Sequence, residues 1–493
     1  MKYTSLKIIP MPKEVIGEKA GGGFELTSIE AKLYCADTAL FSARENLFSF
    51  TKKIHGVELS DAKGGITLSL DTGLADGEYK LEITEGSACV YASGTEGANY
   101  AAASLIQLMR PLENGKIELP LVTVSDKPDC DFRALMVDLA RQWHPFHHLY
   151  FYVDLCALYK IKYLHLHFID TQSYTLPSRK FPKMSTPGCH YSFEDIKILC
   201  DYAELRGVEL IPEIELPGHS QAMVKAYPEI FRNTPDGEVA VDDYSLFNNT
   251  DEDNIICIGK EGVMDALREI LTELAEMFPK SKYIHIGGDE ATITDWAHCR
   301  DCKRYMQEHG INGVKALYSH CVKEITDIVL DIGRTPIVWE GFPREGAEQI
   351  SKDVVVIAWE SYYLTAPDLI DLGFKIINAS WQPLYIIPYE RAEGRLFWGA
   401  KDILEWNIYT WINWNRKTKA YLNPIHIQPT EQVIGGLFCS WECVYEQEAD
   451  RIRENLAALS ERTWNIRRYT TDAQFYEKLS GILPLTEKLS PEE

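Results

Sequence analysis

From about residue 128 onward, short apolar segments alternate with segments of helical period, and this alternation restricts the possible folds most strongly. The apolar segments are rich in β-branched residues, which is typical of buried parallel strands. We expect strands at residues 132–138, 163–169, 208–214, 283–286, 335–339, 354–359, 374–380 and 434–440. Eight such units predict an α/β fold, a (β/α)8 TIM barrel whose chemistry lies at the carboxyl ends of its strands.

Two helices carry clear local signals. Apolar residues fall on one stripe of residues 262–279, and Pro279 ends this segment. Ser192 with Asp195 three residues later predicts a capping box at the start of another helix.

The first 127 residues follow a different pattern. Short β segments precede a helical segment at 95–110, and a further strand follows it. This pattern predicts a small α+β domain at 1–127, and a catalytic barrel with a C-terminal helical tail at 128–493.

Charge and hydropathy disfavour several classes of partner. The 493 residues include 50 Lys+Arg against 73 Asp+Glu, a net charge of −23, without a basic cluster. This charge balance argues against nucleic acid and anionic membrane surfaces as partners. The chain has neither an apolar segment of signal-peptide type at its start nor a run of membrane-spanning length, so we expect a cytoplasmic location.

The twelve cysteines show no framework spacing, which favours reduced thiols over disulfides. One pair, Cys299 and Cys302, has the Cys-x-x-Cys spacing of a zinc ligand pair, with His298 beside it. A tetrahedral zinc site needs four ligands, and the sequence contains no second Cys-x-x-Cys. We therefore expect no metal at this motif.

Chemically active side chains follow the ends of the expected strands. Acidic and basic residues follow the first four, namely Asp138, Arg141, Asp170, Glu213, Glu215, His219, Asp289 and Glu290. Tryptophans follow the later ones, namely Trp339, Trp359, Trp381 and Trp441. Nine of the eleven tryptophans lie beyond residue 330, which favours a shared role over scattered core positions. Aromatic faces opposite carboxylates are typical of a sugar-binding site, because rings stack on C–H faces while acids bind hydroxyls.

The stretch 283-YIHIGGDEA-291 runs from an apolar strand through two glycines into two adjacent acids, Asp289 and Glu290. Glycines permit a close backbone approach. Adjacent carboxyls repel, so the pKa of one of them is expected to rise. A proton held near neutral pH is what a general acid requires.

Several separated motifs resemble, in order and spacing, those of the family 20 glycoside hydrolases, the β-N-acetylhexosaminidases. They are HIGGDEA with Trp296 after it, FRALMVDLAR at 132–141, LHLHFIDTQSY at 164–174, YAELRGVELIPEIELPGH at 202–219, and the GG…W pattern at 435–441. The resemblance covers residues 128–470 and, more loosely, the domain before them.

The resemblance implies a retaining exo-hydrolase that acts on oligosaccharides or glycoconjugates with a terminal N-acetylhexosamine. The substrate's own amide would attack the anomeric carbon and form an oxazolinium. Glu290 would be the general acid/base, and Asp289 would orient the 2-acetamido group. The implied substrate-binding residues are Arg133 for hydroxyls, Asp170 and His219 around Glu290, Trp339, Trp359 and Trp441 around the acetamido group, and Tyr385 for its carbonyl. The resemblance implies no cofactor and no metal.

Some positions depart from the family pattern. Ile387 stands where a Tyr-x-Asp motif would place an acid, and Cys443 where a Trp-x-Glu motif would place a glutamate. Glu442, one residue early, is the candidate substitute. Glu215 and Ala134 replace a frequent aspartate and a frequent glycine. The first two departures concern recognition at the 4- and 6-positions of the sugar.

Two other functions stay open at this level. A metal-dependent barrel hydrolase could use His165, His167, His219, His285 and Asp289 as ligands. A non-catalytic sugar-binding barrel could use the same aromatic residues. The sequence leaves open the choice between GlcNAc and GalNAc, the aglycone and the oligomeric state.

Overall fold

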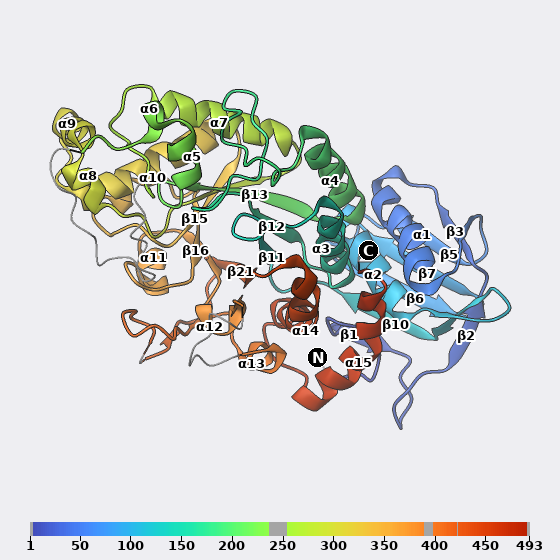
Figure 1. Cartoon of the computed structure of the whole chain (residues 1–493). Helices are drawn as coiled ribbons and strands as arrows, with labels where there is room; N and C mark the ends of the chain where they lie inside the picture. Colours follow the sequence, from blue (N-terminus) through green and yellow to red (C-terminus); the bar gives the residue numbers. More distant parts are fainter. Residues whose placement is uncertain (1–2, 236–253, 389–397, 422, 491–493) are drawn as a thin grey trace.

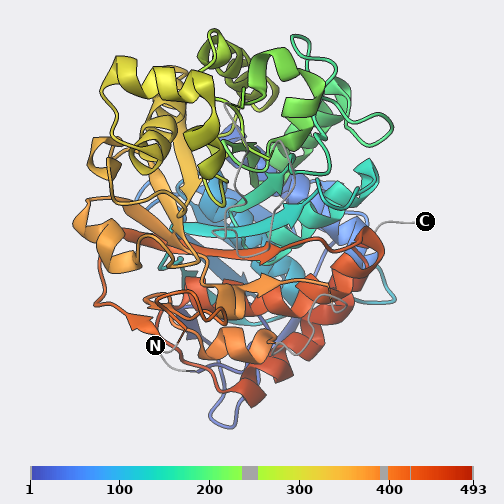
Figure 2. The same ribbon diagram turned by 60° about the vertical axis from the view of Figure 1, so that its left-hand side comes forward.

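The computed structural model describes residues 3–235, 254–388, 398–421 and 423–490. An N-terminal domain, blue in Figure 1, packs against one side of a larger barrel. The turned view in Figure 2 shows helices surrounding the barrel strands. Among the helices of the described residues, none combines the length and the apolar composition that a transmembrane segment requires.

The barrel closes through parallel pairing of its first and last strands. In spatial order, its strands are β11 (Phe132–Asp138), β12 (Tyr163–His167), β13 (Glu209–Leu216), β14 (Tyr283–Gly287), β15 (Thr335–Trp339), β16 (Val355–Ala358), β17 (Lys375–Asn378) and β21 (Val433–Ser440). Each coincides with an expected strand, so the predicted fold class is confirmed. A short strand that the sequence did not predict, β18 (Tyr385–Ile386), pairs with the carboxyl end of β21.

Helices and short strands connect the barrel strands. They are α3 (Phe146–Leu158), α4 (Phe193–Arg206), α5 (Gln221–Ala226), α6 (Pro228–Phe231), α7 (Val263–Met277), α8 (Thr294–His298), α9 (Arg300–His309), α10 (Val314–Asp331), α11 (Ala366–Asp371), α12 (Trp381–Leu384), α13 (Ala400–Glu405), β19 (Thr410–Trp411) and β20 (Ile425–His426). Ser192 and Asp195 form the predicted capping box on α4, and α7 buries the expected apolar stripe. The chain then continues into α14 (Tyr445–Trp464) and α15 (Asp472–Glu487).

The N-terminal domain is built on mixed β-sheets. Among the described residues, one sheet has the order β1 (Glu14–Ile16), β10 (Val122–Asp126), β6 (Tyr79–Thr84), β7 (Ser87–Ala92), β5 (Ile66–Leu70), β3 (Lys32–Cys35) and β4 (Ser60–Asp61). A smaller sheet joins β2 (Leu26–Ile29), β9 (Ile117–Pro120) and β8 (Arg110–Pro111). Helices α1 (Phe41–His55) and α2 (Thr95–Leu108) pack against the larger sheet and also contact α4 and α3 of the barrel.

A buried ion-pair network lies where the two domains meet. Asp154 of α3 accepts a hydrogen bond from Arg206 Nε at 2.7 Å and pairs with Lys53 Nζ of α1 at 2.9 Å. Arg206 also donates to Asn46 Oδ1 of α1 at 3.1 Å. Because buried charges require partners, this network makes the contact between the domains specific.

Hydrogen bonds join the N-terminal domain to the helices α14 and α15. Asp126 of β10 accepts a hydrogen bond from Trp464 Nε1 of α14 at 2.9 Å. The backbone N–H of Met11 donates to Glu461 Oε2 at 2.7 Å, and Lys478 Nζ of α15 donates to the carbonyl of Thr4 at 2.7 Å. The helices α14 and α15 therefore pack against the N-terminal domain as well as following the barrel in sequence.

Candidate active site

Asp289 and Glu290 directly follow β14 at the carboxyl end of the barrel. Gly287 and Gly288 leave the strand with φ of 72° and 104°, and Glu290 itself has φ of 43°. A Cβ atom at Gly287 would collide with the side chain of Glu215 on β13. Glycine is therefore required there, and the turn directs both carboxyls into the end of the barrel.

Glu290 lies at one end of a row of charged side chains, Glu290, His219 and Asp170, which we call the relay. Its Oε2 lies 3.3 Å from Nε2 of His219, and Nδ1 of His219 lies 3.2 Å from Oδ1 of Asp170. Burial lowers the pKa of His219, but the Asp170 carboxylate outweighs it, so the pKa lies well above its ordinary value. His219 is thus held as an imidazolium that donates to both acids.

Asp170 is the centre of this relay. Its Oδ2 accepts hydrogen bonds from Nε2 of His167 at 3.0 Å and pairs with the Arg141 guanidinium at 2.7 Å. Burial raises the pKa of Asp170, but Arg141 and His219 more than offset this effect and hold it well below its usual range. Arg141 also pairs with Asp138 at 3.1 Å. Asp170 therefore remains a carboxylate and orients His219.

Glu213 of β13 is the centre of a second buried set of hydrogen bonds, which lies beneath the relay of Asp170 and His219. Its carboxylate accepts from Nε1 of Trp339 at 2.6 Å and from Nδ1 of His167 at 2.7 Å, and lies 2.8 Å from Nδ1 of His285. These contacts fix the rings of His167 and Trp339 from below. Glu213 thus holds the side chains that contact the relay in position, as hydrogen bonds around a functional site do in other proteins.

Asp289 has a different environment from Glu290. It is buried, and this burial, followed by repulsion from Glu290, raises its pKa to about 7. Among the described residues, Oδ1 of Asp289 and Oε1 of Glu290 are buried without a hydrogen-bond partner. Buried polar atoms are nearly always paired, so these two are expected to bind a substrate or water.

Aromatic rings surround the other side of this end of the barrel. Trp359 and Tyr385 stack with their ring centroids 5.8 Å apart, and Trp381 stacks on Tyr385 at 5.1 Å. Trp339 lies 5.8 Å from Trp441. Burial and the nearby Cys439 and Asp289 raise the pKa of Tyr385 well above its ordinary value, so its hydroxyl stays protonated. The structure thus brings together Trp339, Trp359, Tyr385 and Trp441 beside Asp289.

The prediction for Arg133 is wrong. Arg133 lies near the start of β11, at the opposite end of the barrel, and is completely buried. Its guanidinium donates to the carbonyls of Lys160 and Cys130 and to the hydroxyl of Tyr100, and it packs over the Trp464 ring. It is a structural residue beneath the barrel.

Arg141, after the end of the same strand, is the arginine that lies in the site. Its guanidinium packs over the Trp441 ring, 5.0 Å from the centroid, and its Nε lies 3.9 Å from Glu442. Its position after a strand end was visible in the sequence. Glu360, two residues after the end of β16, was missed: it is buried near Asp289 and Glu290, and burial followed by repulsion from Glu290 raises its pKa well above its ordinary value.

Two of the departures from the family pattern, Ile387 and Cys443, lie together near the end of β21. Cys443 is buried, and Arg451 donates both to its sulfur at 3.5 Å and to the carbonyl of Ile387 at 3.0 Å. Glu442 has φ of 60°, and its backbone N–H donates to Asp138 at 3.2 Å. This turn holds Glu442 near Arg141, whereas Cys443 is directed away from solvent.

The histidines do not form the single ligand set that a metal-dependent hydrolase would need. His165, Glu213 and His285 form one group, and His219, Asp289 and Glu290 form another. Neighbouring carboxylates raise the pKa of His167 to about 10, although burial opposes this. A protonated imidazole has no lone pair for a metal ion, so the raised pKa values of His167 and His219 argue against the ligand set expected above, in which both would bind the ion.

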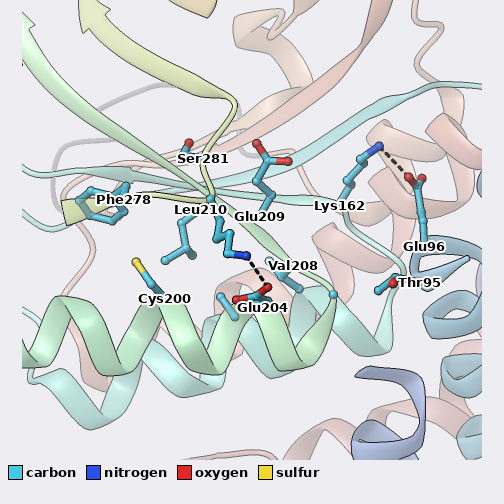
Figure 3. Close-up of a pocket in the computed structure, with 13 residues that line it drawn as sticks. Thr95, Glu96, Lys162, Cys200, Glu204, Val208, Glu209, Leu210, Phe278 and Ser281 are labelled. Carbon is cyan, nitrogen blue, oxygen red and sulfur yellow. Dashed lines mark hydrogen bonds and ion pairs between the residues drawn. The ribbon is translucent and has the colours of Figure 1, made fainter. Parts of the chain in front are cut away.

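A pocket of about 230 Å³ lies at the amino end of the barrel, away from these acids. Figure 3 shows its lining, with the ion pair between Lys162 and Glu96 and the backbone around Leu210. Lys162, Glu209 and Ser281 precede or begin strands β12, β13 and β14. Chemistry in barrels of this kind belongs to the other end, so this pocket is separate from the candidate active site.

Comparison with family models gives two matches. Residues 130–467 match the model described as glycosyl hydrolase family 20, catalytic domain, and residues 5–127 match the model of domain 2 of the same family. The boundary expected after residue 127 falls between the two matches.

Individual relatives agree with these matches. The chain is 27% identical over 479 residues to a β-hexosaminidase of Vibrio furnissii, covering 91% of this chain and 74% of that protein. It is 30% identical over 339 residues to a β-hexosaminidase of Akkermansia muciniphila, covering 65% of this chain and 66% of that protein. A crystal structure of an exo-β-N-acetylglucosaminidase from Vibrio harveyi superposes with a TM-score of 0.83 at 22% identity, covering 99% of this chain and 78% of that one.

Proposed function

Since the chain belongs to glycoside hydrolase family 20 and is a hydrolase of the β-hexosaminidase type, we propose that it removes terminal β-linked N-acetylhexosamine with retention of configuration. The substrate's 2-acetamido group acts as the nucleophile. The observation that carries this proposal is the unequal environment of the two adjacent acids. Glu290 is bound to the relay of His219 and Asp170, whereas Asp289 lies buried beside the aromatic residues.

In the first step, the amide oxygen of the substrate attacks the anomeric carbon, and the bond to the leaving oxygen breaks. Glu290 donates its proton to that leaving oxygen, and an oxazolinium forms. The carboxylate of Asp289 accepts the amide N–H and faces the positive charge as it develops. Trp339, Trp359 and Trp441 hold the acetamido group in position for attack, and Tyr385 donates to its carbonyl.

In the second step, water attacks the anomeric carbon and the oxazolinium ring opens. Glu290, now a carboxylate, accepts the proton of that water. Two inversions at the same carbon leave the β configuration unchanged. The imidazolium of His219 next to Glu290 stabilises the carboxylate between the two steps.

Recognition of the sugar hydroxyls belongs to Arg141 and Glu442 in this proposal. A guanidinium held by Asp138 and Asp170 presents its N–H groups in a fixed geometry. Ile387 and Cys443 offer no acid, so the 4-hydroxyl meets fewer fixed partners. We therefore expect both GlcNAc and GalNAc as terminal sugars. The predicted cytoplasmic location is part of this proposal and is tested by cell fractionation.

The decisive experiment compares Glu290→Gln with Asp289→Asn on aryl β-N-acetylglucosaminides of graded leaving-group pKa. Glu290→Gln removes proton donation, a contribution of about 10²–10⁴-fold, so poor leaving groups suffer most. Asp289→Asn impairs ring closure, so every substrate loses rate to a similar degree. A thiazoline mimic of the oxazolinium should bind the parent tightly and the Asp289 variant weakly.

Proton NMR of the first product gives the stereochemistry directly. Release of the α anomer, or equal leaving-group dependence in the two variants with equal binding of the mimic, would rule out the proposed division of roles. Inversion would call for a general base that activates water, whereas retention with equal leaving-group dependence would call for a test of an enzyme nucleophile such as Glu360. Absence of any hydrolysis, with sugar binding intact, would instead favour the non-catalytic binding barrel.

A further inference from the structure

Three cysteines that are far apart in the sequence meet beside the catalytic loops. Cys299 precedes α9 and Cys302 lies in its first turn, while Cys257 comes from the segment before α7. All three side chains are completely buried. The Cys-x-x-Cys motif thus gains a third thiol that its spacing could not reveal.

The distances between these thiols suit one tetrahedral metal ion. Sγ of Cys257 lies 3.5 Å from Sγ of Cys299 and 3.6 Å from Sγ of Cys302. Zinc–sulfur bonds of about 2.3 Å place neighbouring thiolates of a tetrahedral site roughly 3.8 Å apart. A disulfide would need about 2.05 Å. The sulfurs are therefore too far apart to be bonded and close enough to share one ion.

The surrounding backbone is arranged as it would be around thiolates. The N–H of Thr234 donates to Sγ of Cys299 at 3.3 Å, and the N–H of Cys302 donates to the same sulfur. Gly259 packs so closely on the turn of Cys302 that a Cβ atom there would collide with it. Oδ1 of Asn233 lies 3.8 Å from Sγ of Cys302, which places a neutral oxygen donor next to the three thiols.

We propose that Cys257, Cys299 and Cys302 bind one Zn²⁺ ion, with an oxygen at the fourth position and Asn233 Oδ1 as its candidate. Three thiolates favour a soft or borderline ion, and a tetrahedral arrangement favours zinc among these. The site has no open approach from solvent, because its sulfurs are buried, so its role is structural.

The ion would fasten the two loops that carry the catalytic relay. The segment leading to Cys257 already binds the loop after β13: the N–H of Ile256 donates to the carbonyl of Pro217 at 3.1 Å. The carbonyl of Ile256 accepts from Nε1 of Trp296, in the short helix α8 that follows the loop after β14, at 2.8 Å. One ion shared between Cys257 and the Cys299 turn would thus fix the loop of His219 relative to the loop of Glu290.

The test begins with the unmodified full chain, purified under reducing conditions without added metal and desalted over a chelating resin. Elemental analysis should find about one zinc per chain, released when a mercurial reagent titrates the thiols. Cys257→Ser and Cys302→Ser should each lose most of this zinc and melt at a lower temperature. Cys321→Ser, which changes a completely buried thiol on α10, should keep the zinc and serves as the matched control.

Growth in cobalt gives an independent readout that does not depend on the variants folding. A tetrahedral cobalt–thiolate site has intense visible bands, which should appear in the unmodified chain and in Cys321→Ser. The proposal fails if the unmodified chain carries no stoichiometric metal and its melting temperature does not respond to zinc. It fails equally if mass spectrometry of the freshly purified chain finds two of these three cysteines joined in a disulfide.

Discussion

The substitution Asp289→Asn should stabilise the fold while it impairs the reaction, and the size of this effect follows from the burial of the carboxyl. Its pKa rises from 3.8 to about 7 on folding, because burial and the neighbouring Glu290 disfavour the charge. Below pH 3.8 both states are protonated and the shift has no effect on stability. Between the two pKa values only the unfolded state loses its proton, so stability falls as pH rises, and above pH 7 the loss is complete.

The shift of roughly 3 units corresponds to ~4 kcal/mol of lost stability, at about 1.4 kcal/mol per unit. Asparagine stays neutral and avoids this cost. An unfolding entropy of about 2.1 cal/mol/K per residue gives roughly 1 kcal/mol per kelvin for a chain of this length. The variant should therefore melt ~4 °C above the parent at about pH 8, and only ~1 °C above it at about pH 4.5.

Thermal unfolding monitored by circular dichroism at both pH values measures this difference. Asp76→Asn, which changes an exposed aspartate of the N-terminal domain, controls for the loss of one negative charge from an acidic chain. Equal melting temperatures of parent and Asp289→Asn at pH 8, or a difference that shrinks as pH rises, would show that Asp289 is not held at a raised pKa.

Other predictions concern activity and recognition. Because the reaction needs the Asp289 carboxylate, kcat/KM should fall about tenfold per unit as pH drops below about 7, and this limb of the pH profile should be missing in Asp289→Asn. Arg141→Ala should lower kcat/KM by about 10- to 100-fold, as expected for a lost charged hydrogen bond to substrate, with little change in leaving-group dependence. Arg133→Ala should instead lower the melting temperature by ~3 °C or more and leave kcat/KM of the folded fraction unchanged; a selective loss of sugar affinity would return Arg133 to the site. Since Ile387 and Cys443 replace acids, GalNAc and GlcNAc aryl substrates should differ in kcat/KM by less than about a hundredfold, and a larger ratio would mean that another group reads the 4-hydroxyl.

The sequence predicted the barrel well because a strand buried on both faces is apolar throughout and needs no knowledge of its neighbours. The turn after β14 was equally visible, since two glycines before two acids have few structural explanations. The mistaken arginine shows where this reasoning failed. Arg133 and Arg141 both flank the first strand, yet a strand rises about 3.3 Å per residue, so residue 133 lies roughly 17 Å from the end at residue 138. Which end of a strand a residue occupies decides whether it can reach the substrate.

Contacts between loops could not be predicted from the sequence for a different reason. Cys257 and Cys299 are brought together by the packing of two loops. Neither the periodicity nor the spacing of residues in the sequence predicts this contact. Glu360 was missed because a single acid after a strand resembles any solvated turn residue. Only its burial beside Glu290 distinguishes it.

The contacts between the two ends of the chain bear on the order in which the protein is made. Met11 and Asp126 leave the ribosome 450 and 338 residues before their partners Glu461 and Trp464, respectively. These hydrogen bonds of the N-terminal domain can therefore form only after almost the entire barrel has been synthesised. A nonsense mutation shortly before residue 461 would remove none of Asp170, His219 and Glu290, yet it would leave the N-terminal domain without these hydrogen-bond partners and expose it to proteases.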